Sequence, residues 1–295
     1  GGGLITAEAQ DEMLALAEKI DAPLGCSLMG LSAIPTDHPR FLGMQGMHGH
    51  YASSMAMHNA DVIVSLGVRF NDRVTGNRQK FATGAKIIHI DIDGSELSKT
   101  VNVVCGLRGD VKLTLRKLLP LVNENKKIEW TKKVNAFRKE EESYLDNREG
   151  LTPRKAIMTL NKHLGENTAV ATDVGQHQMW SAQNLSFKTS RRFISSGGLG
   201  TMGFGFGAAI GAAFGTGERS VLVTGDGSFG MNLNELATAV SYNLPVTVVI
   251  VNNGVLGMVR QWQTLFYGKR YSSTVLGRKT DFVKLAEAFG AVGLR

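Results

Sequence analysis

Hydrophobic residues in the second half of the chain form two short runs, at 220–224 and 246–251, that are typical of buried strands. Apolar residues at helical spacing between them predict a helix over 232–242. The apolar face of this helix carries Leu233, Leu236, Ala237 and Val240. A strand, a helix and a strand in this order form a βαβ unit with parallel strands and a right-handed crossover. Gly225-Asp226-Gly227 and Asn252-Asn253 follow the two strands, so both motifs are expected at the carboxyl edge, where open α/β sheets bind ligands.

The first part of the chain, 1–121, also alternates between helical and strand-like patterns. A glycine turn at 1–3 leads into a predicted helix through Ala17, and a second helix is expected over 111–119. The predicted strands of this part are 24–28, 61–66, 86–92 and 101–105. This alternation indicates a doubly wound α/β domain.

Residues 122–150 are rich in charged side chains and show no apolar period wide enough for a core, so we expect a solvated, partly helical linker. A second domain is expected over 151–295. Thr152 is its predicted N-cap and Pro153 its first helical residue, with a strand at 169–173. The predicted fold class is α/β, with two doubly wound parallel-sheet domains.

Length and composition narrow the classes of protein to consider. The 295 residues suffice for two ordinary domains, and 43% hydrophobic residues with 35 glycines suit an α/β protein. The net charge of +7 comes from scattered Lys and Arg, whereas a nucleic-acid-binding face needs clustering. Cys26 and Cys105 form no C-x-x-C motif and are expected to be buried free thiols.

No apolar run reaches membrane-spanning length, so no membrane association is expected. The chain starts at Gly1-Gly2-Gly3 without a Met and stops at Arg295, shortly after a predicted helix. We interpret it as an internal part of a longer polypeptide, and a targeting signal would then lie outside it.

The two strand-end motifs offer oxygen ligands beside a helix start. Asp226 supplies a carboxylate and Asn253 an amide oxygen, both of which suit Mg²⁺ when a phosphate completes the coordination. Gly227 and Ser228 precede a predicted helix, where free N–H groups favour a phosphate. In the first domain, Asp91 follows a β-run at the usual place of a ribose-binding acid.

Longer motifs resemble those of acetohydroxyacid synthase (acetolactate synthase), a family of thiamine diphosphate (ThDP) enzymes. The second domain is similar to the ThDP-binding domain of that family, and the first to its FAD-binding middle domain. The motifs that carry the resemblance span residues 46–49, 67–76, 173–180, 196–204, 257–267 and 281–287. Together with the Gly-Asp-Gly and Asn-Asn pair, they are far more specific than a lone glycine pattern.

The resemblance implies roles for particular residues. Mg²⁺ would be held by Asp226, Asn253 and the carbonyl of Val255, and the substrate pocket would be lined by Val259, Trp262 and Arg73. ThDP would contact Gly175, Gln176, His177, Gly200, Met202, Gly225, Gly227, Ser228 and Met258. FAD would contact Gly2, Gly3, Met47, His48, Gly67, Arg69, Arg73, Asp91, Ile92, Asp110 and Val111. Trp262 would favour 2-ketobutyrate as the second substrate.

Simpler structural roles remain open for several of these residues. Met202 and Met258 could be core fillers, and Trp262 could be an anchor on a helix face. His177 could be a polar loop residue, although its Gly-Gln-His-Gln setting favours a cofactor contact. Arg69 and Arg73 could be solvated, although loop arginines beside glycine suit a diphosphate.

The sequence departs from the family pattern in three respects. Phe206-Gly207 stands where the family usually has Leu-Pro, and His50 replaces a small hydroxyl residue. The glutamate that activates the cofactor in this family belongs to an amino-terminal domain, and no residue here matches it. We therefore assign no catalytic residue within this chain, and we expect the chain alone to be inactive.

The resemblance implies a transferase of branched-chain amino acid biosynthesis that decarboxylates pyruvate and adds the two-carbon unit to pyruvate or 2-ketobutyrate. FAD would be structural. The implied assembly is a homodimer or homotetramer with active sites at subunit interfaces and a possible small regulatory subunit. Such an enzyme would be cytoplasmic in a bacterium, and plastidic or mitochondrial in a eukaryote. The alternatives are another ThDP decarboxylase or carboligase, of the glyoxylate carboligase or pyruvate oxidase type, and a non-catalytic nucleotide-binding relative; Gln261-Trp262-Gln263 argues against the former.

Overall fold

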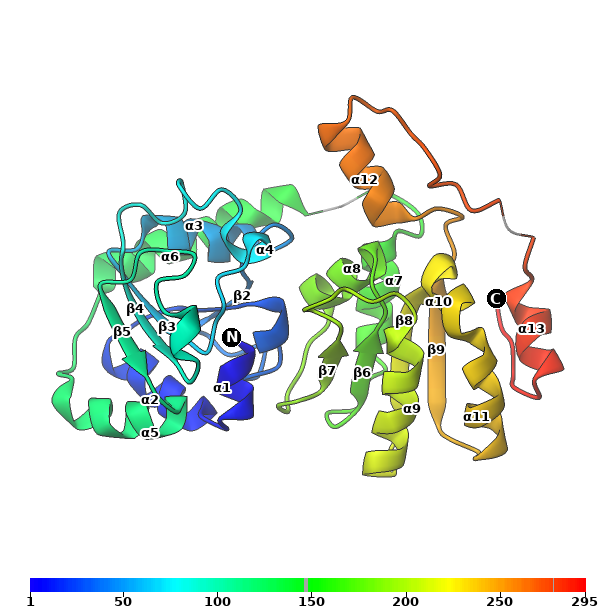
Figure 1. Cartoon of the computed structure of the whole chain (residues 1–295), viewed down its shortest axis with the longest axis horizontal. Helices are drawn as coiled ribbons and strands as arrows, with labels where there is room; N and C mark the ends of the chain where they lie inside the picture. The colour runs from blue at the N-terminus through cyan, green and yellow to red at the C-terminus, as the bar shows by residue number, and fades with distance from the viewer. Residues whose placement is uncertain (146–147, 278) are drawn as a thin grey trace. The chain divides into compact units, whose positions relative to one another are not determined.

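The computed structural model describes residues 1–145, 148–277 and 279–295. The chain divides into two compact units, which are described separately below. Unit 1 comprises Gly1–Gly150 with Ser186–Arg191, and unit 2 comprises Leu151–Leu185 with Arg192–Arg295 (Figure 1). Within the described residues, unit 1 contains two β-sheets and unit 2 contains one. The strands within each sheet pair in parallel, and helices pack against the sheets. The predicted α/β class with parallel sheets is confirmed. None of the described helices is long and apolar enough to cross a membrane.

Unit 1 contains a two-stranded sheet and a three-stranded sheet. The first pairs β1 (Leu24–Cys26) with β2 (Phe41–Met44), and the second has the order β3 (Val62–Leu66), β4 (Lys86–Asp91), β5 (Cys105–Arg108). The helices are α1 (Gly2–Thr6), α2 (Gln10–Lys19), α3 (Tyr51–Asn59), α4 (Asp72–Thr75), α5 (Val111–Leu118) and α6 (Ile128–Glu141). Leu4, Leu16, Leu66, Ile90 and Leu115 form the main core, which buries one face of α5 against the central strand β4.

Several predicted elements of unit 1 need correction. The expected single helix through Ala17 is two helices, because the chain turns between them with Glu8 at φ 53°. The strand predicted at 101–105 lies instead at Cys105–Arg108. Cys105 is therefore on an edge strand and is exposed, contrary to expectation, whereas Cys26 is buried. Burial raises the pKa of the Cys26 thiol to about 12.

The charged segment after α5 was predicted to be a solvated, partly helical linker. It is partly helical, but it is not solvated throughout, because α6 packs against α3. Val134 and Phe137, three positions apart on α6, are buried, and Val134 joins a small core with Leu42. The Glu141 carboxylate accepts hydrogen bonds from the N–H groups of Tyr51 (3.1 Å) and the following residue, which caps the start of α3. A narrow apolar stripe therefore suffices to fix this helix, while its charged residues occupy the outer face.

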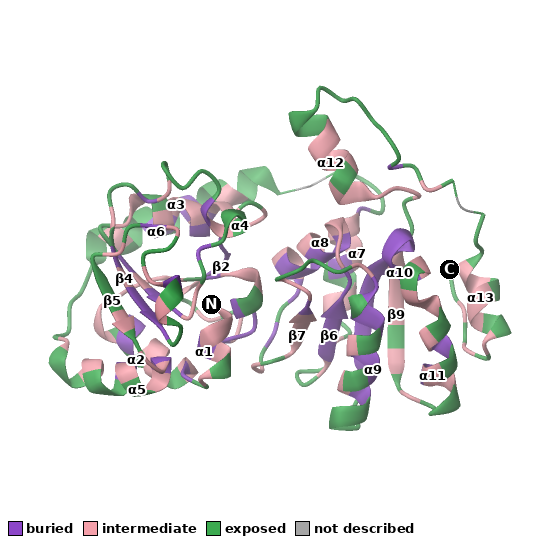
Figure 2. Ribbon diagram, viewed as in Figure 1, coloured by how far each residue is buried: buried purple, intermediate pink, exposed green. Residues whose placement is uncertain are grey.

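Unit 2 contains a four-stranded sheet in the order β7 (Phe193–Ser195), β6 (Ala169–Thr172), β8 (Ser220–Gly225), β9 (Val246–Val251). The helices are α7 (Pro153–Asn161), α8 (Gln176–Asn184), α9 (Phe204–Thr216), α10 (Asp226–Asn232), α11 (Leu236–Ser241), α12 (Gly257–Phe266) and α13 (Phe282–Ala288). The strands β6 and β8 are buried along their whole length (Figure 2). Thr152 accepts a hydrogen bond from the Lys155 N–H at 3.2 Å, which confirms the predicted N-cap of α7.

The predicted βαβ unit is present, with β8 and β9 parallel and paired from Ser220–Val246 to Gly225–Val251. Its crossover is not one helix over 232–242. It consists of α10, a 3₁₀ turn (Leu233–Glu235) and α11. The turn rotates the apolar face, so that Ala239 rather than the predicted Ala237 is buried with Leu236. Because α10 starts directly at Asp226, no loop separates the strand from the candidate metal ligand.

Candidate functional site

Three segments of unit 2 leave the carboxyl ends of adjacent strands and bring the predicted cofactor residues to one edge of the sheet. The helix α8 begins shortly after β6, α10 follows β8 without a loop, and residues 252–256 join β9 to α12 (Figure 1). The register that pairs Gly225 with Val251 places Asp226 and Asn252 at the same level of neighbouring strands. The sheet therefore brings together the two motifs whose meeting was predicted from the βαβ pattern.

His177 lies in the first turn of α8, and its ring is buried against the tip of β8. A Cβ atom added to Gly225 would lie 2.9 Å from His177 Nδ1. The side chain is 6% exposed, and its Nε2 has no hydrogen-bond partner among the described residues. Burial lowers the pKa of His177 to about 4, against the opposing effect of a hydrogen bond to the backbone of Asp173. The ring is thus neutral at pH 7, with one buried nitrogen available for a ligand.

Met202 reaches the same place from the glycine-rich segment before α9. A Cβ atom on Gly227 would lie 2.8 Å from Leu256 Cδ2, 3.4 Å from Leu276 Cδ1 and 3.6 Å from Met202 Cε. Only a glycine leaves the start of α10 open at this point. Met202 is therefore a neighbour of the Gly-Asp-Gly turn, and its contact with the cofactor stays a prediction.

Two further predicted contacts, Ser228 and Gln176, already have polar partners within the chain. The Ser228 hydroxyl donates to the carbonyl of Val174 at 2.9 Å, which ties α10 to the β6–α8 connection. The Gln176 side chain donates from Nε2 to Oε1 of Gln261 at 3.3 Å and so connects α8 with α12. Gly200 has a φ of 68°, and a Cβ atom added to it would lie 3.8 Å from Cγ1 of Val174.

The donor set for a metal consists of oxygens from two strands. Asp226 is 3% exposed at the first position of α10. Asn253 Oδ1 accepts the N–H of Val255 at 3.1 Å, and its second lone pair is left for a cation. Val255 itself is held by an antiparallel bridge to Val275. The described residues contain no group of three or more His, Cys, Asp or Glu side chains suited to a metal. A metal here would thus need phosphate or water oxygens as well, which is the usual arrangement for Mg²⁺.

Asp173 is a residue of this site to which the sequence motifs assigned no role. It directly follows β6 and is fully buried. Its carboxylate accepts the N–H of Gly205 at 2.8 Å and the hydroxyl of Thr224 at 2.7 Å. The available signal was its position after a β-run, the same position that drew attention to Asp91.

Comparisons with known proteins agree with this geometry. Residues 173–295 match the family model described as thiamine pyrophosphate enzyme, C-terminal TPP binding domain, and residues 1–118 match the model of the central domain of the same enzymes. The chain belongs to the thiamine pyrophosphate enzymes. The segment that begins at Asp173 is thus a ThDP-binding domain, and the cluster around His177 and Gly227 lies within it.

Individual relatives of this thiamine pyrophosphate enzyme include large subunits of acetolactate synthase. The isozyme 3 large subunit of Escherichia coli is 44% identical over 304 residues, covering 100% of this chain and 53% of the relative. A probable large subunit from Methanocaldococcus jannaschii is 45% identical over 301 residues, covering 98% of this chain and 51% of the relative. The large subunit from Buchnera aphidicola subsp. Schizaphis graminum is 43% identical over 301 residues, covering 100% and 53%. The chain spans about half the length of these curated relatives.

Two of the predicted substrate residues of this thiamine pyrophosphate enzyme, Val259 and Trp262, lie on α12, which has no buried residue, whereas Arg73 lies in α4 of unit 1. Val259 is 51% exposed, and the Trp262 ring packs edge-on against Phe266 with 5.4 Å between centroids. Gln261 is the residue of α12 whose described hydrogen bond reaches the cluster. The structure thus connects α12 to the ThDP cluster through Gln261, and the cofactor or substrate contacts of Met258, Val259 and Trp262 stay predictions.

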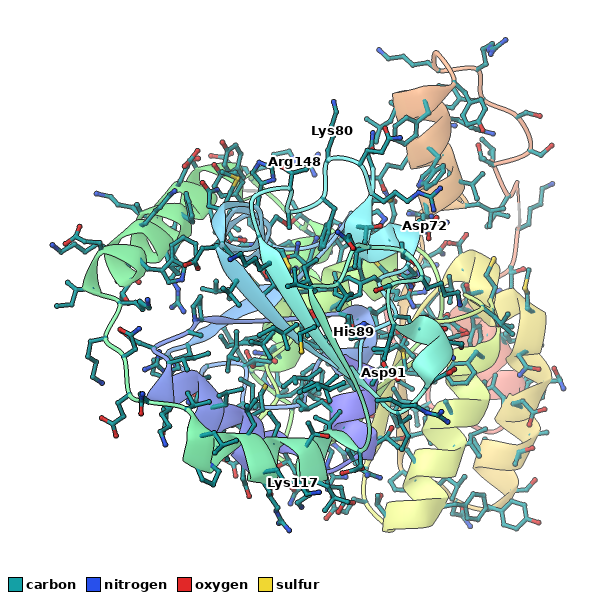
Figure 3. The ribbon with its side chains drawn as sticks, turned by 60° about the vertical axis from the view of Figure 1, so that its left-hand side comes forward. Asp72, Lys80, His89, Asp91, Lys117 and Arg148 are labelled. Carbon is teal, nitrogen blue, oxygen red and sulfur yellow. The ribbon has the colours of Figure 1, made fainter. Side chains whose placement is uncertain are left out.

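In the central domain, a first group of predicted FAD residues lies at the ends of β4 and β5. Asp91 is buried and accepts the N–H of Asp93 at 3.0 Å. Its carboxylate lies 3.7 Å from Nε2 of His89, and both residues are labelled in Figure 3. Burial lowers the pKa of His89. Asp110 caps α5 by accepting the N–H of Leu113 at 2.9 Å, whereas Val111 is part of the core and Ile92 is exposed.

A second group gathers around α4. The Met47 N–H donates to the carbonyl of Arg73 at 2.8 Å. Burial and the Arg73 guanidinium lower the pKa of His48. Arg73 also forms an exposed ion pair with Asp72 at 2.6 Å. Arg69 is exposed and belongs instead with the first group. Hydrogen bonds from Ser95 are the main cause of the lowered pKa of the Asp93 carboxyl, and the charge of Arg69 contributes to a smaller extent.

The glycines at the start of the chain make close backbone contacts in the central domain. The Gly3 N–H donates to the carbonyl of Gly67 at 3.1 Å, and Gly2 opens α1. The departure at His50 is also explained here, because its Nδ1 accepts the Met44 N–H at 3.0 Å and fixes the turn that carries Met47 and His48.

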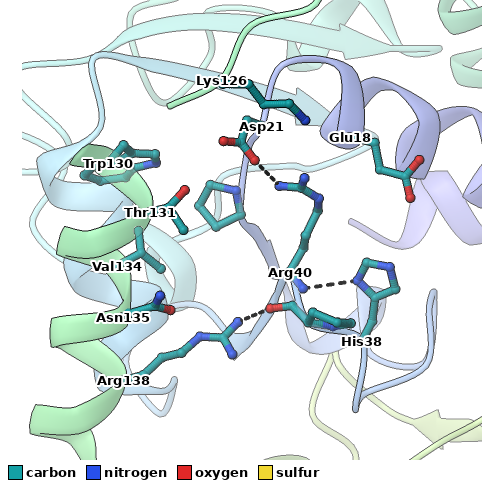
Figure 4. Close-up of a pocket in the computed structure, with 12 residues that line it drawn as sticks. Glu18, Asp21, His38, Arg40, Lys126, Trp130, Thr131, Val134, Asn135 and Arg138 are labelled. Carbon is teal, nitrogen blue, oxygen red and sulfur yellow. Dashed lines mark hydrogen bonds and ion pairs between the residues drawn. The ribbon is translucent and has the colours of Figure 1, made fainter. Parts of the chain in front are cut away.

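A cavity of about 760 Å³ in unit 1 lies away from every predicted site residue (Figure 4). The Arg40 guanidinium on its wall pairs with Asp21 at 2.9 Å, and Asp21 also accepts the Lys127 N–H at 2.9 Å. Arg138 donates to the carbonyls of Pro39 and Phe41. The polar side chains of this cavity thus hold α6 against the body of the unit, and we assign it no ligand.

Proposed function

We propose that this chain is part of the catalytic subunit of an acetohydroxyacid synthase. The reaction releases CO₂ from pyruvate and joins the remaining two carbons to a second pyruvate, giving 2-acetolactate, or to 2-ketobutyrate, giving 2-aceto-2-hydroxybutyrate. The observation that carries the proposal is the meeting of His177, Met202 and Gly227 beside Asp226 at one strand edge. The names of the relatives at 43–45% identity support this choice among the thiamine pyrophosphate enzymes.

ThDP supplies, when bound, an electron sink for decarboxylation and carbon–carbon bond formation. We assign its diphosphate to the first turns of α8 and α10, where N–H groups and the unpartnered Nε2 of His177 are available. The ligands on the diphosphate side are Gly175, Gln176, His177, Gly225, Gly227 and Ser228. Gly200, Met202 and Met258 are assigned to contacts with the rings of ThDP, where Met202 would pack against the thiazolium ring.

Mg²⁺ would be held by Asp226, Asn253 and the carbonyl of Val255. The carboxylate would neutralise part of the metal charge, and the metal would in turn neutralise the diphosphate. Asp226 is buried at the start of α10, where its carboxylate oxygens would face the metal and the diphosphate at one strand edge.

FAD is assigned to unit 1, at the ends of β3, β4 and β5 and at the turn that carries Met47. The proposed contacts are Gly2, Gly3, Met47, His48, Gly67, Arg69, Arg73, Asp91, Ile92, Asp110 and Val111. Asp91 would bind the ribose, and Arg69 would lie near the diphosphate. Neither substrate is oxidised or reduced overall in the reaction, so the flavin would serve the structure of the site.

Substrate contacts are assigned to Val259 and Trp262 in unit 2 and to Arg73 in unit 1, with Trp262 selecting the second substrate. A single methylene in a pocket is worth roughly 1–3 kcal/mol of discrimination, or about 5- to 150-fold. Trp262→Leu should lower the preference for 2-ketobutyrate over pyruvate and leave pyruvate decarboxylation largely intact. Product ratios in a competition assay measure this, with Trp130→Leu in unit 1 as the control; an unchanged ratio for Trp262→Leu would exclude the role.

The complete enzyme would be a homodimer or homotetramer with active sites at subunit interfaces, and a small regulatory subunit is a further candidate partner. Its activating glutamate would come from a domain outside this chain, and the enzyme would work in the cytoplasm of a bacterium or archaeon. We therefore expect the 295-residue chain alone to form no acetolactate, and to aggregate because large apolar side chains such as Leu199 and Phe214 are exposed.

The decisive experiment is an assay of the complete protein with ThDP, Mg²⁺, FAD and pyruvate. Release of CO₂ together with 2-acetolactate supports the proposal. Release of CO₂ with acetaldehyde or acetate as the product would identify a related decarboxylase or oxidase instead. Absence of ThDP binding by calorimetry would favour a non-catalytic relative.

A further inference from the structure

Asp173 connects the segments around the candidate ThDP site through both of its carboxylate oxygens. The side chain is fully buried. One oxygen accepts the Gly205 N–H at 2.8 Å, at the start of α9, and the other accepts the Thr224 hydroxyl at 2.7 Å, next to the tip of β8. A buried carboxylate is tolerated only when donors satisfy it, and bonds to an ionised acceptor are stronger than neutral ones. The carboxylate thus joins β6, β8 and α9.

The backbone of Asp173 contacts β8 again and also α8. Its N–H donates to the carbonyl of Val223 on β8 at 3.1 Å. Its carbonyl accepts a hydrogen bond from the His177 ring. Since Nε2 of His177 has no partner among the described residues, the ring nitrogen that faces Asp173 is Nδ1. Asp173 therefore sets the orientation that leaves Nε2 available for a ligand.

The start of α9 is pressed directly onto Asp173. A Cβ atom on Gly205 would lie 2.7 Å from the backbone nitrogen of Asp173 and 2.7 Å from Leu222 Cδ1. Met202 is three residues before Gly205, and its Cε is 3.6 Å from the Cβ position of Gly227. A shift of this helix start would thus move Met202 relative to the Gly-Asp-Gly turn.

We infer that Asp173 is a positioning residue, which holds the α8 start, the α9 start and the β8 tip in the arrangement that ThDP requires. The inference rests on the proposed function, because it needs ThDP at this strand edge. Asp173 touches no part of the predicted ligand itself and acts through His177, Met202 and the segment around Thr224. Residues that orient the ligands of a bound metal act in this way, and their loss typically lowers metal affinity about 10- to 100-fold. We expect an effect of the same order on ThDP affinity.

Thr224 offers a matched pair of variants for the test. Thr224→Val keeps the shape of the side chain and removes the donor to Asp173, whereas Thr224→Ser keeps the donor. We expect Thr224→Val to weaken ThDP binding at least tenfold and Thr224→Ser by less than about threefold. Both are measured by calorimetry in the complete protein at fixed Mg²⁺. The KM for pyruvate should stay the same, because no substrate contact is altered.

Asp173→Asn provides a second variant should Thr224→Val fold poorly. The amide oxygen can still accept the Gly205 N–H. The amide N–H can donate to the Thr224 hydroxyl, which then donates to the carbonyl of Gly225 alone, so the charge is lost and one hydrogen bond is reversed. Its ThDP affinity should lie between those of the two Thr224 variants. The shift in melting temperature on adding ThDP separates the two roles, since a purely structural residue lowers the melting temperature and leaves that shift unchanged.

The outcomes distinguish the inference from the function on which it rests. A parent protein that does not bind ThDP overturns the proposed function and the inference with it. A parent that binds, with Thr224→Val and Asp173→Asn binding equally well, overturns the inference alone. Weak binding by Thr224→Val with near-parental binding by Thr224→Ser supports it.

Discussion

The two units differ in how closely they bring their predicted cofactor residues together. In unit 2, His177 lies against Gly225 and Met202 against Gly227 of the same Gly-Asp-Gly turn, because their segments leave adjacent strands β6 and β8 or pack directly on them. In unit 1, the predicted residues fall into two groups, around Asp91 and around Arg73, which come from a sheet edge and from separate loops. The carboxyl edge of one parallel sheet gathers short motifs automatically, whereas loops need further contacts to bring their residues together.

The difference also concerns what each residue does without a ligand. In unit 1, Asp110 caps a helix and Val111 fills the core, so their positions are explained by folding alone. In unit 2, the buried Nε2 of His177 has no such explanation within the described residues. Unpartnered polar atoms are rare inside proteins, and this one is a stronger sign of a ligand than the positions of Asp110 and Val111. In unit 1, the buried ring of His89 also has nitrogens that are unpartnered among the described residues, but His89 is not one of the predicted FAD residues.

The largest effect is expected at Asp226. Asp226→Ala removes the only carboxylate proposed for Mg²⁺, so ThDP affinity at fixed Mg²⁺ should fall by at least roughly a hundredfold. Calorimetry on the complete protein measures this, and Glu218→Ala, an exposed carboxylate before β8, is the control. An unchanged dissociation constant for Asp226→Ala would contradict the assignment of the whole strand edge.

A glycine pair on α9 tests whether the site depends on close packing at the end of β6. Gly205→Ala should destabilise the chain by about 1–3 kcal/mol, because the added carbon has no room beside Asp173 and Leu222. Gly211→Ala, on the same helix with open space around it, should stabilise by about 0.5–1 kcal/mol. Urea unfolding of both variants measures the difference, and equal stabilities would show that α9 can move away from β6.

The buried ring of His177 should make the stability of unit 2 depend on pH. Its folded pKa of about 4 lies below the ordinary value of 6.5, so the unfolded chain binds more protons in this range. The stabilisation is complete above pH 6.5 and decreases as the pH falls towards 4, by up to about 3 kcal/mol. Urea unfolding without ThDP at pH 7 and pH 5 should show a smaller loss for His177→Gln than for the parent. Equal losses would mean that the ring is solvated.

Local patterns predicted the strand edge of unit 2 well. The run 246–251 coincides with β9, and the motifs that follow both strands lie where the βαβ rule placed them. Strand composition and turn residues are properties of neighbouring positions, and parallel pairing follows from their order. Thr152 was predicted for the same reason, because an N-cap acts within four residues.

Elements that depend on distant contacts were missed. The role of Asp173 rests on partners 32 and 51 positions away, and no local pattern reports them. The helix α6 is fixed by two buried residues among many charged ones, and its contact with α3 supplies what periodicity does not show. The position of Trp262 relative to the ThDP cluster is likewise not set by its motif, since α12 has no buried residue to orient it.

The remaining prediction concerns the less convergent site, in unit 1. Arg69→Ala should remove a charge-assisted contact to the FAD diphosphate, which is worth about 1.5–3 kcal/mol, or roughly ten- to hundredfold in affinity. Flavin fluorescence during titration of the complete apoprotein measures the dissociation constant. Arg78→Ala, another exposed arginine after α4, is the matched control and should bind FAD like the parent. Equal weakening by both variants would indicate a general effect of positive charge rather than a specific contact. A parent protein that binds no FAD would leave unit 1 with the fold of a central domain and no flavin, and would confine the cofactor chemistry of this chain to the strand edge of unit 2.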